Sequence, residues 1–139
     1  FPQVLIWKDS IKSKVVQGDD MVAPFGGKRR FHLITEENLE EVKRQAINFL
    51  PQNTASELTV WSLCQLNSMG VSIISTVHDS IIADVPTSEA FDTARLMKQV
   101  MESAAMECLG WDLPFTVDIS MSDVSWGEVE EVELGAIAA

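Results

Sequence analysis

The sequence is poor in cysteine and contains no long hydrophobic run. Its two cysteines, Cys64 and Cys108, lie in apolar, helix-like contexts without the close spacing of a metal knuckle, which favours buried free thiols in a reducing cytoplasm. No apolar stretch approaches the roughly 20 residues that a bilayer-spanning helix needs, so we expect no membrane partner. Phe1 and the residues after it lack the features of a signal peptide, and such a start suggests a piece of a longer or split protein.

Basic residues are also scarce, and they are unevenly distributed. Ten Lys and Arg against 21 Asp and Glu give a net charge of −11, which taken alone argues against nucleic-acid binding. Eight of the ten lie within residues 1–50, where Lys28-Arg29-Arg30 and Lys43-Arg44 form clusters. We therefore expect any contact with phosphates to come from this part of the chain.

The periodicity of the first 70 residues predicts a helix, a hairpin and two further helices. Apolar positions at spacings of three and four predict a helix over 4–15, and Gly26-Gly27 between two extended stretches predicts a short β-hairpin with an exposed basic edge. Thr35 is the predicted N-cap of a helix that should stop before Pro51. A second, central helix should run from about Asn53 to Gly70.

The second half combines strands with one long helix. Residues 71–77 predict a buried strand and 81–85 its return, with His78-Asp79-Ser80 as the turn. Thr87 or Ser88 should cap a long helix that Gly110 ends, and the alternation over 115–121 predicts a strand with one covered face. The fold class is therefore α+β, with an antiparallel hairpin and a strand packed against several helices.

Asp79 is the sharpest single feature of this pattern. A tight turn between two apolar strands holds its carboxylate on a rigid support, as a metal ligand in phosphoryl transfer requires. The alternative is an ordinary turn aspartate that hydrogen-bonds to its own backbone, and the neighbouring His78 could equally be a simple turn histidine.

A second group consists of Arg44, Asn48 and Gln52. Arg44 and Asn48 share one face of the predicted helix, and Gln52 follows just beyond its expected end at Pro51. These donors could reach the minor-groove acceptors that occupy similar places in every base pair, so they would test pairing geometry and not sequence. The alternative is a solvated helix face.

Four stretches, in this order and spacing, resemble family A DNA polymerases, the group that contains bacterial DNA polymerase I and many phage replicative polymerases. Gly26-Gly27-Lys28-Arg29-Arg30 is similar to a Gly-Arg-Arg-Arg hairpin, and residues 44–57, R-Q-A-I-N-F-L-P-Q-N-T-A-S-E, to R-x-A-x-N-x-x-x-Q-G-T-A-A-D. Val77-His78-Asp79-Ser80 resembles motif C, usually V-H-D-E, and Asp118 to Glu128 resembles the closing strand and tryptophan segment. The resemblance covers the chain from about residue 20.

The resemblance implies the C-terminal palm segment of such an enzyme, in the cytoplasm of a bacterial or phage-infected cell. Residues 1–35 would end the fingers region, 36–128 would form the C-terminal part of the palm, and 129–139 would be a frayed acidic and Ala-rich tail. It also implies two Mg²⁺ ions as cofactors, with primer–template DNA and deoxynucleoside triphosphates as partners.

The resemblance further implies the roles of individual residues. Asp79 would be the catalytic metal ligand, and His78 would lie against the primer end. The remaining implied DNA contacts are Arg44, Asn48 and Gln52 near the new base pair and Lys28, Arg29 and Arg30 on the DNA backbone.

Two departures keep other functions open. Ser80 stands where most family members have Glu, and His-Asp-Ser is typical of single-subunit phage-type RNA polymerases. The second aspartate of a two-metal site lies on an earlier strand in the family, and Asp84 and Asp118 are only formal substitutes. We therefore expect the chain to need a complementary N-terminal polymerase segment. An RNA polymerase fragment and a non-catalytic DNA-binding or structural fragment are the alternatives.

Overall fold

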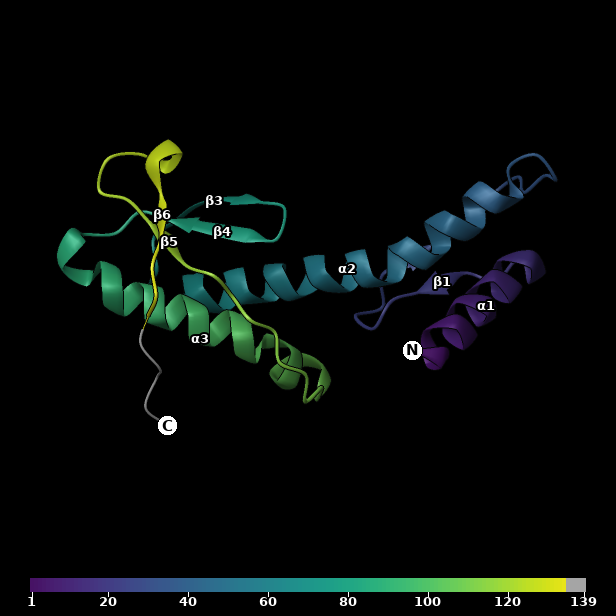
Figure 1. Cartoon of the computed structure of the whole chain (residues 1–139), viewed down its shortest axis with the longest axis horizontal. Helices are drawn as coiled ribbons and strands as arrows, with labels where there is room; N and C mark the ends of the chain where they lie inside the picture. The colour runs from purple at the N-terminus through teal and green to yellow at the C-terminus, as the bar shows by residue number, and fades with distance from the viewer. Residues whose placement is uncertain (135–139) are drawn as a thin grey trace. The chain divides into compact units, whose positions relative to one another are not determined.

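The computed structural model describes residues 1–134, and they form an α+β structure, as the sequence predicts (Figure 1). The chain divides into two compact units, Phe1–Glu57 and Leu58–Ala139, hereafter the first and second unit. The elements in chain order are α1 (Pro2–Gln17), β1 (Met21–Val22), β2 (Lys28–Arg29), α2 (Leu39–Ser68), β3 (Ile73–Val77), β4 (Ser80–Ala83), the 3-10 turn Thr87–Glu89, α3 (Ala90–Leu109), β5 (Ser120–Met121), the 3-10 turn Trp126–Glu128 and β6 (Glu130–Glu131).

The core of the first unit lies where α1 packs against the start of α2. Ile11 and Val15 of α1 are buried against Val42 and Ala46 of α2, and Met21 of β1 closes the same cluster. The predicted first helix is confirmed. It ends where Gly18 takes a left-handed conformation (φ 80°), which lets its N–H reach the last carbonyls of the helix.

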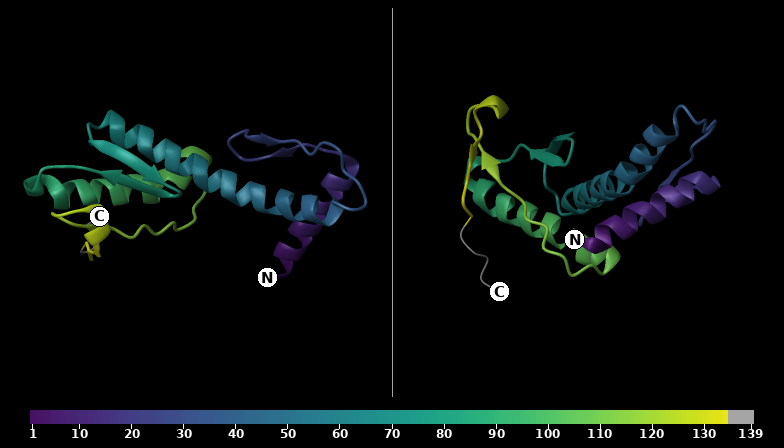
Figure 2. Two further views of the ribbon diagram at one scale, coloured as in Figure 1. Left: turned by 90° about the horizontal axis from the view of Figure 1, so that it is seen from above. Right: turned by 45° about the vertical axis from the view of Figure 1, so that its right-hand side comes forward.

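The predicted break at Pro51 is wrong, because α2 continues through it as one helix (Figure 2). Proline lacks an N–H, so the carbonyl of Ile47 loses its usual helical donor. Apolar contacts on both sides of the proline favour the helix nonetheless, since Ala46 and Leu58 are both buried. The hydroxyl of Thr54 also donates to the carbonyl of Leu50, at 2.7 Å.

Thr35 does not cap this helix, contrary to prediction. The helix begins at Leu39, and Asn38 before it accepts the N–H of Val42 on its carbonyl, at 3.0 Å. The Asn38 side chain instead orders the approach: its Oδ1 accepts the N–H of Thr35 and its amide donates to the carbonyl of Leu33, both at 2.9 Å. The Asn38 side chain thus satisfies backbone groups of the preceding loop, and the helix starts about one turn later than predicted.

The second unit is built on the packing of α3 against the last turns of α2. Its buried cluster consists of Leu66 on α2, Val71 just after that helix, and Val100 on α3. The partly buried Ile73 and Ile81 pack against this cluster. A strand forms at Ile73–Val77 as predicted, but the expectation that it is buried is wrong, because none of its residues is more than partly buried. Helix α3 ends at Gly110 as predicted, but a 3-10 turn precedes it in place of a side-chain cap at Thr87 or Ser88.

The strand predicted over 115–121 is much shorter in the structure. Only Ser120–Met121 forms a ladder, and its partner is Glu130–Glu131, within the region predicted to be a frayed tail. The preceding stretch is held by side chains of α3: Lys98 Nζ donates to the Val117 carbonyl at 2.5 Å, and Glu102 accepts the Val117 N–H at 3.0 Å. The rest of the predicted tail, residues 135–139, lies outside the described residues.

The two cysteines are free, as predicted, but they are not buried. Cys64 is exposed and Cys108 is partly covered. Cys64 lies two positions from both Ser62 and Leu66, which are buried, and a step of two residues leads to the opposite side of a helix. Among the described residues, no helix is both long enough and apolar enough to cross a membrane.

Candidate functional sites

Asp79 lies at the tip of the β3–β4 hairpin. Val77 pairs with Ser80, so the turn contains only His78 and Asp79 and not the three residues predicted. His78 adopts a left-handed conformation (φ 56°), and both turn residues are exposed. Within residues 1–134, no side chain or backbone group hydrogen-bonds or ion-pairs with the Asp79 carboxylate. The hairpin therefore presents an open carboxylate.

The base of this hairpin is anchored although its tip is open. Ile73 on β3 and Ile81 on β4 pack against the Leu66 cluster, and the N–H of Asp84 donates to the carbonyl of Ser72 at 3.0 Å. The pairing shifts register between Ile73 and Ser75, which marks a β-bulge in β3. Such bulges bend a strand and change the direction of its end, here the turn with Asp79.

As a metal site, the Asp79 tip is incomplete by itself. Carboxylate oxygens are the ligands that Mg²⁺ prefers, so Asp79 fits one ligand position. Among the described residues, no three His, Cys, Asp or Glu side chains come together in a group that could hold a metal ion. Asp84 and Asp118 therefore do not complete such a group with Asp79.

Arg44, Asn48 and Gln52 lie on one exposed stripe of α2, which we call the donor row. Because the helix continues through Pro51, the three residues follow each other at intervals of four and share a face. Gln52 thus belongs to the same helix as the other two, and not to a segment beyond its end. The guanidinium of Arg44 forms an ion pair with Glu41 one turn earlier.

The basic hairpin consists of β1, β2 and the turn between them, and it presents Lys28, Arg29 and Arg30 to solvent. Val22 pairs with Lys28 and Met21 with Arg29, in a shorter ladder than predicted. Its two arginines have partners: Arg29 Nη2 donates to Gln45 Oε1 at 2.8 Å, and Arg30 Nε donates to Asp20 Oδ2 at 3.0 Å. Lys28 has none within the part of the chain that the structure describes.

Two residues that the sequence analysis missed connect these features. Gln45 Nε2 donates to Glu41 Oε1 at 2.9 Å, so Gln45 bridges Arg29 and Glu41. The hydrogen bond from Gln45 is the main cause that lowers the pKa of the Glu41 carboxyl; burial opposes it, and the charge and hydrogen bond of Arg44 lower the pKa further. The one available signal was the spacing of four between Glu41 and Gln45, which permits such a side-chain pair on a helix.

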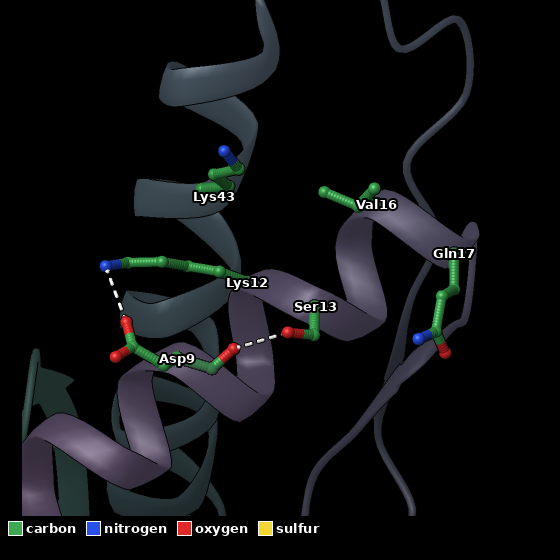
Figure 3. A pocket seen from close by; sticks show the side chains of 6 residues that line it. All are labelled: Asp9, Lys12, Ser13, Val16, Gln17 and Lys43. Carbon is green, nitrogen blue, oxygen red and sulfur yellow. Dashed lines mark hydrogen bonds and ion pairs between the residues drawn. The ribbon is translucent and has the colours of Figure 1, made fainter.

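A hollow of about 450 Å³ in the first unit holds none of the predicted site residues. Figure 3 shows Lys12 reaching towards Asp9, with which it forms an ion pair at 3.0 Å. The hollow is lined by Asp9, Lys12, Ser13, Val16, Gln17 and Lys43. Its surface lysines and single ion pair do not form a catalytic group.

Comparison with known proteins identifies the family. Residues 1–128, almost the whole chain, match the model of DNA polymerase family A. The chain belongs to DNA polymerase family A. This result confirms the family inferred from the four motifs.

Individual relatives agree with this assignment. The chain is 31% identical over 112 residues to a DNA polymerase of Bacillus phage SP01 and 30% identical over 112 residues to the thermostable DNA polymerase I of Thermus aquaticus. These alignments cover 74% and 73% of the chain but 12% and 13% of the relatives. DNA polymerase theta of Drosophila melanogaster is 26% identical over 125 residues, which are 78% of the chain and 6% of that protein.

Proposed function

We propose that the chain is the C-terminal portion of a template-directed DNA polymerase, which adds deoxynucleotides to a primer 3′-hydroxyl. The observation that carries the proposal is Asp79, an exposed carboxylate with no partner among residues 1–134, on a hairpin whose base is anchored in the core. The motif around it and the family membership of residues 1–128 support the assignment. An anchored hairpin fixes the position of the carboxylate, which a metal ligand in catalysis requires to within a fraction of an ångström.

Asp79 is the proposed metal ligand of the reaction. When bound, two Mg²⁺ ions would favour the deprotonated primer hydroxyl and neutralise charge on the phosphates. Asp79 would contribute one of the carboxylates that hold them, and Ser80 beside it cannot contribute a second. The other carboxylate would come from a complementary N-terminal segment of the polymerase, so we expect the isolated chain not to extend primers.

The proposed DNA contacts come from three places. The donor row would reach the minor-groove acceptors next to the new base pair, where purine N3 and pyrimidine O2 occupy similar positions in every pair. His78 would contact the primer end beside Asp79. Lys28, Arg29 and Arg30 would contact backbone phosphates, which set the position of the duplex without reading its sequence.

The decisive experiment is reconstitution of the enzyme. The chain is mixed with an N-terminal polymerase fragment that carries the missing aspartate, and primer extension is measured with deoxynucleotides and with ribonucleotides. We expect extension with deoxynucleotides only, and Asp79→Ala should abolish it with little loss of DNA binding. Asp84→Ala, which removes another exposed carboxylate just beyond the same hairpin, should leave extension intact.

Two results would contradict the proposal. Near-normal extension by Asp79→Ala would exclude Asp79 as the catalytic metal ligand. Metal-independent duplex binding with no extension in any mixture would instead indicate a non-catalytic DNA-binding module that acts through the basic hairpin.

A further inference from the structure

Helix α2 carries a second row of side chains beside the donor row. Glu41, Gln45, Phe49 and Asn53 also follow each other at intervals of four, and rows of this kind run side by side on a helix surface. The donor row is exposed, whereas Gln45, Phe49 and Asn53 are partly buried. Glu41 is exposed, and the basic hairpin contacts Gln45 and Asn53 of this second row.

The first contact between the hairpin and this row is a relay of polar side chains. Arg29 of the hairpin donates to Gln45 Oε1 at 2.8 Å, and Gln45 donates to Glu41 Oε1 at 2.9 Å. The other oxygen of Glu41 accepts from Arg44, the first member of the donor row. Arg29 is also placed over the ring of Phe31, with its Cζ 5.2 Å from the centroid. Two residues, Gln45 and Glu41, thus link a hairpin arginine to a donor-row arginine.

The second contact is a close approach of Gly27 to Asn53. A Cβ at position 27 would lie 2.5 Å from Asn53 Oδ1 and 3.1 Å from its Cγ, so only glycine fits there while Asn53 keeps its place. Asn53 Oδ1 is buried, and no described residue donates a hydrogen bond to it. Eight residues separate Gln45 from Asn53, which corresponds to about 12 Å along a helix. The hairpin therefore meets α2 at two separate points, one a hydrogen bond and one a close packing contact.

We infer that Glu41 and Gln45 are positioning residues, which dock the basic hairpin onto α2, with Gly27 fitted closely against Asn53, so that Arg29 and Arg44 contact the same DNA duplex as one surface. The shared DNA surface rests on the proposed function, because Glu41 and Gln45 act only through residues that are proposed to contact DNA. Docking before binding reduces the side-chain freedom that two long arginines lose on the duplex, which strengthens binding without an added contact.

Steric rescue tests the Gly27–Asn53 contact. Gly27 lies outside the left-handed region, so alanine there adds crowding without backbone strain. We expect Gly27→Ala to speed amide hydrogen exchange in residues 21–30 and to weaken duplex binding by the full chain several-fold. Adding Asn53→Gly should restore both. Gly127→Ala is the matched control, because the nearest atom to its new Cβ would be Ser125 Oγ at 3.9 Å, an ordinary contact.

A double-mutant cycle tests the relay. Gln45→Leu removes both hydrogen bonds of Gln45 without changing the net charge, and we expect it to weaken duplex binding about tenfold. In an Arg29→Ala background the same change should cost less than about twofold, because Gln45 would have no arginine left to position. Equal losses in both backgrounds would show a merely structural Gln45 and would overturn its positioning role.

Hydrogen exchange separates failure of this inference from failure of the proposed function. Unchanged exchange over residues 21–30 in both Gly27→Ala and Gln45→Leu would overturn the docking, whatever the DNA affinity. If the unmodified chain shows no duplex binding while the variants loosen the hairpin, the docking stands. The shared DNA surface and the proposed DNA contacts would then both be refuted.

Discussion

The β1–β2 hairpin and the β3–β4 hairpin both expose charged residues near their turns, but among the residues that the structure describes only the arginines of the first hairpin have partners. Arg29 is bound to Gln45 and Arg30 to Asp20, and Gly27 packs against Asn53. At the tip of the second hairpin, by contrast, no described residue pairs with the carboxylate of Asp79.

The difference follows from what each hairpin is proposed to bind. An arginine has several donors, so it can keep an intrachain partner and still offer N–H groups to a phosphate. A carboxylate that already pairs with a cation loses part of its capacity for a metal ion. A docked basic hairpin and an open acidic tip are therefore the arrangements that suit phosphate contact and metal binding, respectively.

The distribution of charge over the two units supports the same contrast. The first unit has eight Lys and Arg and eight Asp and Glu, whereas residues 58–139 have two and thirteen. An acidic surface attracts cations and repels phosphates. The proposed metal ligand thus lies in the acidic unit, whereas the proposed phosphate contacts lie in the first unit.

The largest effect is expected at Asp79. Asp79→Asn keeps the shape of the side chain and removes its charge, so extension by the reconstituted enzyme should fall on the order of 10³-fold. Duplex affinity should stay within about twofold.

Changing Lys28, Arg29 and Arg30 together to Ala should instead weaken duplex binding. It should also lower the salt dependence of that binding by up to about 3 in the log–log slope, because three phosphate contacts are lost. Single-turnover extension and fluorescence anisotropy measure the two effects, and loss of both activities in either variant would break the comparison.

The next effect concerns the base of the second hairpin. Leu66 is fully buried beneath it, so Leu66→Ala should lower the free energy of unfolding by about 2–5 kcal/mol. Urea denaturation measures the change, and hydrogen exchange should rise in β3 and β4. Leu113→Ala removes an exposed leucine and should cost little. Equal costs for the two variants would contradict the proposed anchoring of the hairpin.

A smaller effect is expected at the turn itself. His78 has a φ of 56°, a conformation that costs residues other than glycine roughly 1–2 kcal/mol. His78→Gly should therefore leave stability unchanged or raise it by up to about 1 kcal/mol, because the added chain entropy of glycine offsets part of the gain. His78→Val should lower stability, since β-branched residues avoid this region. Thermal unfolding distinguishes the two, and the reverse order would exclude a left-handed turn.

The ion pair between Arg30 and Asp20 should contribute little to stability. Both side chains are largely exposed, at 64% and 38%, so Asp20→Asn should change the free energy of unfolding by no more than about 1 kcal/mol. The same change frees Arg30 and removes a negative charge, so duplex affinity should rise at low salt. Lower affinity would show that Arg30 needs its intrachain partner.

The smallest effect is a pH dependence at Glu41. Its folded pKa lies below the ordinary value of 4.5, chiefly through the hydrogen bond from Gln45. A carboxyl whose pKa is lower in the folded than in the unfolded chain stabilises the fold at pH values above its unfolded pKa. This stabilisation is lost as the pH falls through its folded pKa. Gln45→Leu should flatten the stability curve below about pH 4.5, as urea titrations at successive pH values can show. An unchanged curve would exclude the Gln45 hydrogen bond as its source.

Local patterns predicted the elements well where side chains close in sequence decide them. Apolar spacing located α1 and α3, and glycine marked the ends of both helices. The chain order of the motifs also led to the family. Local rules failed at Pro51, where contacts with distant residues outweigh the local preference, and at residues 71–77, where the fold leaves the strand less buried than its apolar run predicts.

The candidate site shows the same division. Asp79 and the donor row could be identified from residue types and motif spacing alone. Gln45 and Asn53 could not, because their roles depend on Arg29 and Gly27, which lie 16 and 26 positions earlier in the chain.

The amino-acid sequence by itself determined the family, the residues that carry the proposed chemistry and the class of the fold, because these depend on residue types and their order. Only the tertiary structure decided that α2 is one helix, that the basic hairpin is docked on it, and that no residue within 1–134 pairs with Asp79. These features depend on which side chains meet across the fold, and a hydrogen bond or a buried contact forms only between groups that the folded chain brings within a few ångströms.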